Sequence, residues 1–189
     1  MPGIYIVYPS NASDAKGLLK MACRMNDPVL FMEHKGLYRQ GYAATDEPDS
    51  DYIIPFGKGR LVSNGNYLTL VTWGAMVQKS VEAVQELLLE ENIVEIIDIR
   101  TLNPIDFDIL EVSINKTGKV LIVHEDNLTN GPGAEISAMI SEKFFEYLDG
   151  PIKRVAAKDS PIPFNWVIEE KILPQTKDIS NAIEELLEY

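Results

Sequence analysis

Apolar and polar residues at the start of the chain first follow a strand pattern and then a helical one. Residues 4–8 combine β-branched and aromatic side chains, and the Pro-Ser-Asn sequence that follows ends the strand and begins a helix. Apolar or small residues at three- and four-residue spacing predict an amphipathic helix over 12–25. An Asp-Pro pair ends it, and residues 28–34, PVLFMEH, predict a buried strand.

The next stretch has no periodicity. Residues 35–52 are polar and contain glycine, proline and acidic side chains, which is typical of a linker. Regular patterning returns at Ile53, where IIPFGKGRLVSNG predicts two short strands on either side of Gly57-Lys58-Gly59. Short apolar runs and helical stripes then alternate to the end of the chain. The predicted elements are a strand at 67–74, a helix from Val77 to Asn92, a strand at 93–100, a helix opening at Pro104 and Asp106, a strand at 119–126, a helix at 133–148, a strand at 152–157 and a helix at 178–187.

This alternation predicts an α/β fold with a mostly parallel sheet and helices on both faces. The first strand, helix and strand span only about 35 residues, so they form an incomplete domain with unpaired strand edges. The later part, about 130 residues, is long enough to fold on its own.

Composition and charge narrow the class of protein. The chain has 189 residues, of which 46% are hydrophobic and 24% charged, and it has neither a membrane-spanning apolar run nor a signal-peptide pattern. Its single cysteine, Cys23, cannot form an intrachain disulfide, which favours a reducing cytoplasm, and on the first helix it is expected to be a small buried residue. The net charge of −12 argues against nucleic acid and favours a basic protein partner.

Two stretches carry most of the candidate chemistry. EHKGLYR, residues 33–39, groups an acid, an imidazole and cations, but a strand end running into a solvated linker is the favoured explanation. HEDNLTNGPGAEI, residues 124–136, has the order of a phosphate-binding loop but lacks its third glycine and places Glu135 in the first helical turn, so a glycine turn is favoured. His34 and His124 are the only histidines, so a His-rich zinc site is excluded.

Five blocks in this order resemble one known family. PGIYIVYPSNASDAKGLLKMACRMNDPVLFMEHKGLYR, LVTWGAMV, EIIDIRTLNPID, VLIVHEDNLTNGPGAEI and DSPIPF look like the C-terminal part of the beta subunit of the thiamine-diphosphate-dependent decarboxylase component of 2-oxo acid dehydrogenase complexes. The fourth block looks closer to the branched-chain (2-oxoisovalerate) type than to the pyruvate type. The parent enzyme would be an oxidoreductase that decarboxylates a 2-oxo acid and transfers the acyl unit to a lipoyl group.

The resemblance implies a division into three parts. Residues 1–36 would be the C-terminal remnant of a pyrimidine-binding domain, 37–59 a linker, and 60–189 a transketolase C-terminal-like domain. The family's catalytic histidine stands two residues before the Pro-Gly pair, which is Pro2-Gly3 here, and the cofactor-activating glutamate lies further upstream. No catalytic or cofactor-binding residue is therefore assigned to this chain, and His34 is not assigned a catalytic role. The chain alone is expected to be inactive, and neither thiamine diphosphate nor magnesium is expected to bind to it.

The resemblance also implies a potassium site built from main-chain oxygens. It would map to Ala22, Cys23, Met25 and Asp27, with Met25 replacing an aspartate common in the family. Pro132 departs from the family as well, because an aromatic residue usually lies between the two glycines there.

The implied partners are the alpha subunit, a second copy of this chain, and the basic peripheral subunit-binding domain of the acyltransferase core. Acidic residues Glu142, Glu146 and Asp149 would form the docking surface for the last of these, unless they are simply a solvated acidic face. The alternatives are a pyruvate dehydrogenase beta subunit and a stand-alone non-catalytic binding module. Transketolase and deoxyxylulose-phosphate synthase are disfavoured, because sugar-phosphate sites need basic side chains and these loops are acidic.

Overall fold

The computed structural model describes residues 3–88 and 92–189. The N-terminal unit consists of β1 (Tyr5–Val7), α1 (Ala12–Ala22) and β2 (Val29–Phe31), followed by the 3₁₀ turns η1 (Lys35–Leu37) and η2 (Gly41–Ala43). Helix α1 begins where the Asn11 side chain accepts a hydrogen bond from the backbone N–H of Asp14, at 2.9 Å. The predicted strand, helix and strand are therefore present, and the expected linker contains two short helical turns. The expectation that the second strand is buried is wrong, because Leu30 of β2 is 49% exposed at the edge of its sheet.

The C-terminal unit alternates strands and helices, as the sequence predicts. Its elements are β3 (Arg60–Ser63), β4 (Leu68–Thr72), α2 (Met76–Glu86), β5 (Val94–Asp98), β6 (Thr101–Asn103), α3 (Phe107–Thr117), β7 (Val120–Asn127), α4 (Pro132–Phe144), η3 (Phe145–Tyr147), β8 (Lys153–Ala157), α5 (Trp166–Ile172) and α6 (Thr176–Leu187).

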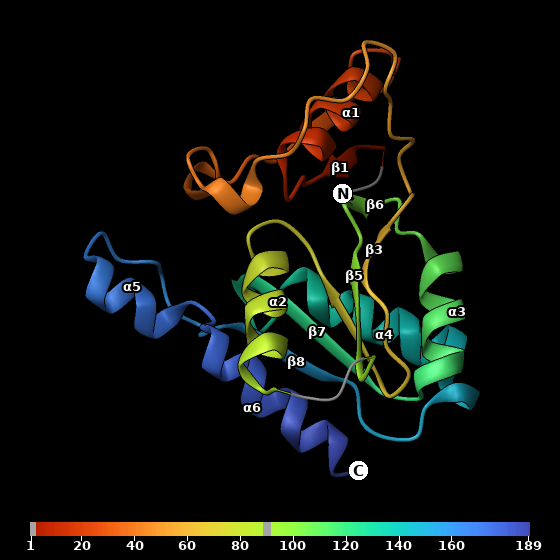
Figure 1. Ribbon diagram of the computed structural model, residues 1–189, viewed down its shortest axis with the longest axis vertical. Helices are drawn as coiled ribbons and strands as arrows, with labels where there is room; N and C mark the ends of the chain where they lie inside the picture. The colour runs from red at the N-terminus through yellow and green to blue at the C-terminus, as the bar shows by residue number, and fades with distance from the viewer. Residues whose placement is uncertain (1–2, 89–91) are drawn as a thin grey trace.

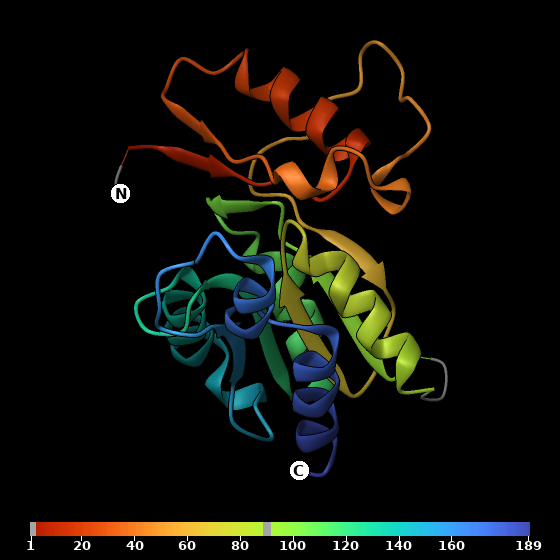
Figure 2. The same cartoon turned by 90° about the vertical axis from the view of Figure 1, so that its left-hand side faces the viewer.

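Five of these strands form one sheet in the order β3-β5-β4-β7-β8. Neighbours among β5, β4, β7 and β8 are parallel, and only β3, at one edge, is antiparallel. Side chains on alternate positions of β4 enter two separate cores. Leu68 and Leu70 face α2 and α6, whereas Val71 faces α3 and α4. Figures 1 and 2 show the two helix pairs on opposite sides of the sheet, which confirms the α/β fold class.

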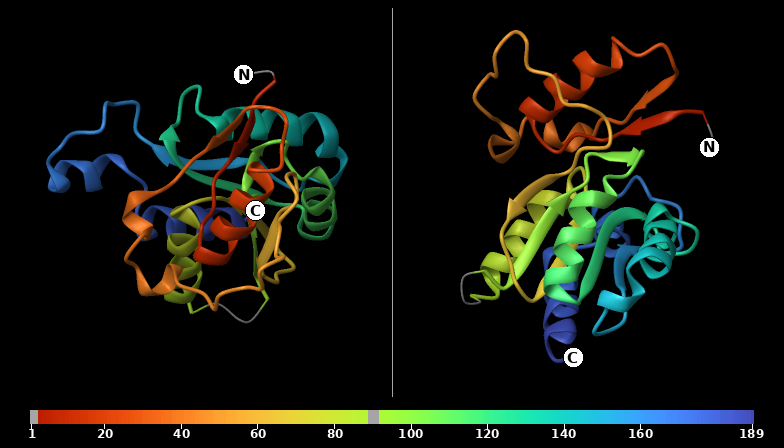
Figure 3. Two further views of the ribbon diagram at one scale, coloured as in Figure 1. Left: turned by 90° about the horizontal axis from the view of Figure 1, so that it is seen from above. Right: turned by 90° about the vertical axis from the view of Figure 1, so that its right-hand side faces the viewer.

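A second, three-stranded sheet joins the two units. Its order is β2-β1-β6, so the C-terminal unit supplies β6, which pairs antiparallel with β1. The expectation that both edges of the first strand pair would be open is therefore wrong for β1. The chain can turn back after β5 because Arg100 adopts a left-handed conformation, with φ of 55°. Figure 3 shows the N-terminal unit lying across the end of the larger sheet.

Other differences from the predicted elements have local causes. Residues 53–56 form no strand, and the Ile54 N–H instead donates to the carbonyl of Gly17 in α1 at 3.2 Å. The Ile54 side chain packs against Gly17, where an added Cβ would lie 2.6 Å from the Ile54 Cγ1 atom. Helix α2 ends at Glu86 rather than Asn92, and residues 89–91 of the predicted helix lie outside the described residues. Strand β6 and helix α5 were not predicted. In the part of the chain that the structure describes, no helix has the length and apolarity needed to cross a membrane.

Candidate functional site

The two sheets meet at the carboxyl ends of their parallel strands, and a network of buried charges lies at this junction. Asp98, at the end of β5, accepts hydrogen bonds from Ser10 Oγ at 2.5 Å and from Arg60 Nη2 at 3.2 Å. Asp14, in the first turn of α1, forms ion pairs with Arg60 Nε at 3.3 Å and Arg100 Nη2 at 3.2 Å. Both carboxylates are almost completely buried, so the network fixes the N-terminal unit against the C-terminal unit.

The surroundings of Asp98 act in opposite directions on the pKa of its carboxyl. Burial raises the pKa of the Asp98 carboxyl, whereas the hydrogen bond from Ser10 and the charge of Arg60 act to lower it. Sequence pattern alone singles out none of these residues. Asp98 does occupy the end of a predicted strand, but nothing in the sequence indicates that Arg60, 38 residues away, would reach it.

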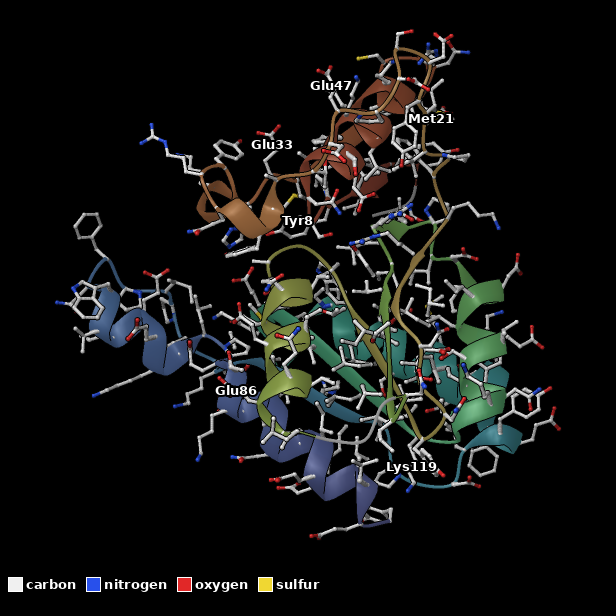
Figure 4. All side chains as sticks on the ribbon, viewed as in Figure 1. Tyr8, Met21, Glu33, Glu47, Glu86 and Lys119 are labelled. Atoms are coloured by element: carbon white, nitrogen blue, oxygen red, sulfur yellow. The ribbon has the colours of Figure 1, made fainter. Side chains whose placement is uncertain are left out.

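The two candidate stretches, EHKGLYR and HEDNLTNGPGAEI, come together at the same junction. His34 Nε2 lies 3.3 Å from Glu125 Oε2, and this contact joins the segment between β2 and η1 to β7 of the five-stranded sheet. The hydrogen bond to Glu125 is the main cause that raises the pKa of His34 above its usual value. Tyr8 lies beside them, where burial, with Glu125 as the second cause, raises its pKa to about 12. Figure 4 labels Tyr8 where the two units meet.

His124 is fully buried one residue before Glu125. Its ring stacks on Trp73, with centroids 5.4 Å apart and an interplanar angle of 5°. Burial lowers the pKa of His124 to about 4, so its imidazole is neutral at pH 7. Neither ring nitrogen has a hydrogen-bond partner in the described part of the chain. A neutral imidazole shut off from solvent does not exchange protons with a substrate, so we assign His124 to packing.

The glycines after β7 make room for this ring. A Cβ at Gly133 would lie 2.3 Å from His124 Nε2, and one at Gly131 would lie 2.9 Å from the ring carbon Cε1. Helix α4 begins at Pro132, which lacks the N–H that the first helical position would leave unbonded. Glu135 stands in the first turn of α4, as the sequence predicts. These features favour the glycine turn over a phosphate-binding loop.

A cavity of about 340 Å³ lies at the carboxyl ends of β1 and β2, beside the start of α1. Its walls are mainly apolar, and its polar groups include Glu33 and His34. Tyr38 Oη donates a hydrogen bond to Glu33, so this carboxylate already has a partner. The cavity contains no cysteine or serine nucleophile next to a base, so it has the features of a small binding pocket rather than those of a hydrolytic site.

The four residues of the predicted potassium site lie in one turn. Ala22 is the last residue of α1 and Cys23 is its C-cap, and Met25 N–H donates to the Ala22 carbonyl at 3.1 Å. Figure 4 labels the neighbouring Met21 at the end of α1 away from the junction. Cys23 is exposed, so the expectation of a buried thiol is wrong, because this last turn of α1 projects beyond the packed core. Across residues 3–88 and 92–189, no three His, Cys, Asp or Glu side chains converge to hold a metal.

The predicted docking residues lie close together along the chain. Glu142 is on α4, Glu146 is in η3, and Asp149 follows η3, and all three are exposed. Lys143, the base among them, lies 5.0 Å from the centre of the Phe107 ring. The three acids are therefore exposed to solvent, whereas Lys143 is directed towards an aromatic ring.

Comparison with known proteins first defines the class. Residues 57–179, more than half of the chain, match the family described as the transketolase C-terminal domain, and residues 1–40 match the transketolase pyrimidine binding domain. The chain belongs to the transketolase C-terminal domain family.

Particular relatives then narrow the resemblance. The chain is 42% identical over 188 residues to the pyruvate dehydrogenase E1 component subunit beta of Staphylococcus epidermidis and to that of Staphylococcus aureus. Each match covers 100% of this chain and 57% of the relative, so the chain spans little more than half the length of these subunits. A solved structure, "Split gene transketolase, inactive beta4 tetramer", is similar in fold, with a TM-score of 0.78 and 24% identity over 100% of this chain and 58% of that one. The resemblance to the C-terminal part of a beta subunit is confirmed, and the relatives are of the pyruvate type rather than the branched-chain type.

Proposed function

We propose that this chain is the C-terminal part of a beta subunit of a pyruvate-type 2-oxo acid dehydrogenase. The observation that carries the proposal is 42% identity along the whole chain to pyruvate dehydrogenase E1 beta subunits. The branched-chain interpretation depended on one sequence block, whereas this identity extends over 188 residues. The parent enzyme would act in the cytoplasm, in keeping with the single unpaired cysteine.

We propose the division 1–36, 37–59 and 60–189 for the remnant of the pyrimidine-binding domain, the linker and the transketolase C-terminal-like domain. Thiamine diphosphate, when bound to such an enzyme, supplies the stabilised carbanion that decarboxylation needs. The described residues do not fit that group, because their buried carboxylates are paired with arginines and His124 is packed against Trp73. We therefore assign no step of the reaction to residues of this chain.

The role that we assign to the chain is assembly. The buried network of Asp14 and Asp98 holds the remnant in place, which would orient the upstream part of a complete subunit against the C-terminal unit. The partners would be the alpha subunit, a second copy of this chain, and the peripheral subunit-binding domain of the acyltransferase core. The split-gene transketolase of similar fold is described as a beta4 tetramer, which supports self-association through this fold.

A chimera tests this proposal. The chain would replace the matched 57% of the Staphylococcus aureus beta subunit and be expressed with that organism's alpha subunit. We expect an assembled enzyme that turns over pyruvate, because the upstream part of the Staphylococcus aureus beta subunit and the alpha subunit supply the reacting groups and this chain supplies the assembly surface. A chimera that fails to bind the alpha subunit would overturn the proposal.

The chain alone should be inert. Calorimetry of the 189-residue chain with thiamine diphosphate and magnesium should show no binding at micromolar concentrations, because a cofactor needs a preformed site. Potassium is a separate proposal for the turn of Ala22, Cys23, Met25 and Asp27. Thermal unfolding in potassium chloride and in tetramethylammonium chloride at equal ionic strength tests it, since only a bound ion stabilises the folded state selectively.

Acidic docking is the last part of the proposal. Reversing Glu146 and Asp149 to lysine should slow association with the basic peripheral domain about tenfold or more at low salt. The matched control reverses Asp46 and Asp51, which are also exposed but lie in the linker. Equal association rates for the two double variants would exclude this surface, and a rate that does not fall with added salt would contradict the electrostatic mechanism.

A further inference from the structure

Residues 160–168, which we call the arm, extend away from the body of the protein and include the first three residues of α5. None of the seven residues of α5 is buried, although the helix begins with Trp166. The exposed fractions are 107% for Phe164, 68% for Trp166 and 50% for Ile168, and Ile162 and Val167 are also exposed. Figures 1 and 3 both show α5 standing away from the sheet and its covering helices.

Such an arm is unfavourable in an isolated chain. Contiguous exposed aromatic and aliphatic side chains mark interaction sites, whereas single exposed apolar residues are ordinary. A helix of seven residues is too short to be stable without packing against another surface. The arm therefore needs a partner surface.

A groove of about 500 Å³ lies next to the base of the arm. It runs between β8, which is the last strand of the five-stranded sheet, and the segment 170–178. Leu128, Val155, Leu173 and Pro174 provide apolar walls. The lining of the groove is therefore apolar in part.

The charge of the groove is opposite to that of the chain as a whole. Its lining includes Arg154, Lys158, Lys171 and Lys177 but only two acids, Glu170 and Asp178. The whole chain has a net charge of −12, so this is a local concentration of positive charge.

The arm has the complementary character. It carries no charged residue, and Glu169, which does not line the groove, follows it directly in the sequence. An apolar segment followed by an acid therefore matches a partly apolar groove in which bases outnumber acids. The groove of the same copy is out of reach, because residues 170–174 both continue the arm and form a wall of that groove.

We propose that two copies of this chain exchange arms, so that the arm of each copy fills the β8 groove of the other. Each copy contributes one arm and one groove, which gives the two identical contacts that a two-fold axis requires. Direct pairing of β8 with the β8 of a second copy is opposed by Lys153 and Arg154, since basic residues on edge strands prevent such pairing. The proposal specifies the surface for the self-association proposed above and rests on it.

Two variants with opposite defects test the exchange. The arm variant carries Phe164→Ser and Trp166→Ser, and the groove variant carries Lys158→Glu and Lys177→Glu. All four side chains lie outside the buried core, so the fold should be retained. We expect each variant by itself to dimerise at least about 30-fold more weakly than the parent chain in sedimentation velocity, as loss of a central aromatic anchor does.

Mixing the two variants gives the decisive measurement. An intact arm from the groove variant can enter the intact groove of the arm variant, so the mixture should form heterodimers that neither variant forms alone. A dye on Cys23, the single and exposed thiol, reports them by energy transfer. The matched control, Val112→Ser with Phe145→Ser, removes equally exposed apolar side chains elsewhere and should dimerise like the parent.

Each other outcome overturns the exchange. If the groove variant by itself dimerises like the parent chain, the arms pack on each other or on another surface. If the arm variant by itself dimerises like the parent chain, the arm is not part of the interface. Two monomeric variants that form no heterodimer when they are mixed also refute the exchange. In each of these cases, a parent chain that is dimeric still supports the proposed self-association. A parent chain that is monomeric at tens of micromolar refutes both the exchange and the proposed self-association. The chimera experiment still decides the assignment to a beta subunit.

Discussion

The buried imidazole of His124 should make this protein sensitive to acid. In the folded chain its pKa is about 4, whereas an unfolded histidine has a pKa of about 6.5. The folded state therefore binds fewer protons than the unfolded state, so the stability contribution is complete above about pH 6.5 and is lost as the pH falls towards 4. Between pH 7 and pH 5 these two pKa values give a loss of about 2 kcal/mol from this residue alone.

The perturbation is His124→Phe, which retains an aromatic ring to stack on Trp73 but cannot be protonated. Urea unfolding of the parent and the variant at pH 7 and pH 5 measures the free energy of unfolding at each pH. The variant should lose about 2 kcal/mol less than the parent between these values, whatever its stability at pH 7. Comparing differences removes the contribution of every other titrating group that the substitution leaves unchanged.

His34 provides a control of opposite sign. Its hydrogen bond to Glu125 raises the folded pKa, so its contribution is complete below the unfolded pKa and is lost as the pH rises through the folded value. His34→Gln should therefore increase the loss of stability on acidification, by no more than about 1 kcal/mol, because the pair is partly exposed. If His124→Phe shows the same pH dependence as the parent, the imidazole is not buried in its neutral form and the reasoning fails.

Three further predictions concern packing and exposure. Arg100→Met leaves Asp14 with one of its two cations and should lower the free energy of unfolding by about 3 kcal/mol or more, measured by urea titration, whereas a change below about 1 kcal/mol would show that the network is solvated. Gly133→Ala places a methyl group against His124 and should cost about 1–3 kcal/mol in the same assay, with Gly41→Ala, where an added Cβ meets nothing within 4 Å, as the control. Cys23 should react with a thiol reagent in the native chain within a few-fold of its rate in urea, and full protection would contradict its exposed position.

Much of this protein follows from local sequence pattern. The apolar runs that predict β4, β5 and β7 are the buried strands of the sheet, and the stripes of α2, α3, α4 and α6 are the helix faces that cover it. The pattern succeeds because a strand buried on both faces must be apolar throughout, and a covering helix must be apolar on one side. The resemblance of ordered blocks added the family, which the comparisons confirm.

Tertiary structure alone decided how the two units are joined. Strand β6 has only three residues, too few for a periodic signal, and it exists because β1 offers it an edge to pair with. The pairing of His34 with Glu125, and of Arg60 with Asp14 and Asp98, brings together residues from separate elements. The sequence does not show whether a charged residue is exposed, because the fold determines whether water is removed from around it and which partner it meets. The burial of Asp98 and His124, and the pKa shifts that follow from it, could therefore be known only from the structure.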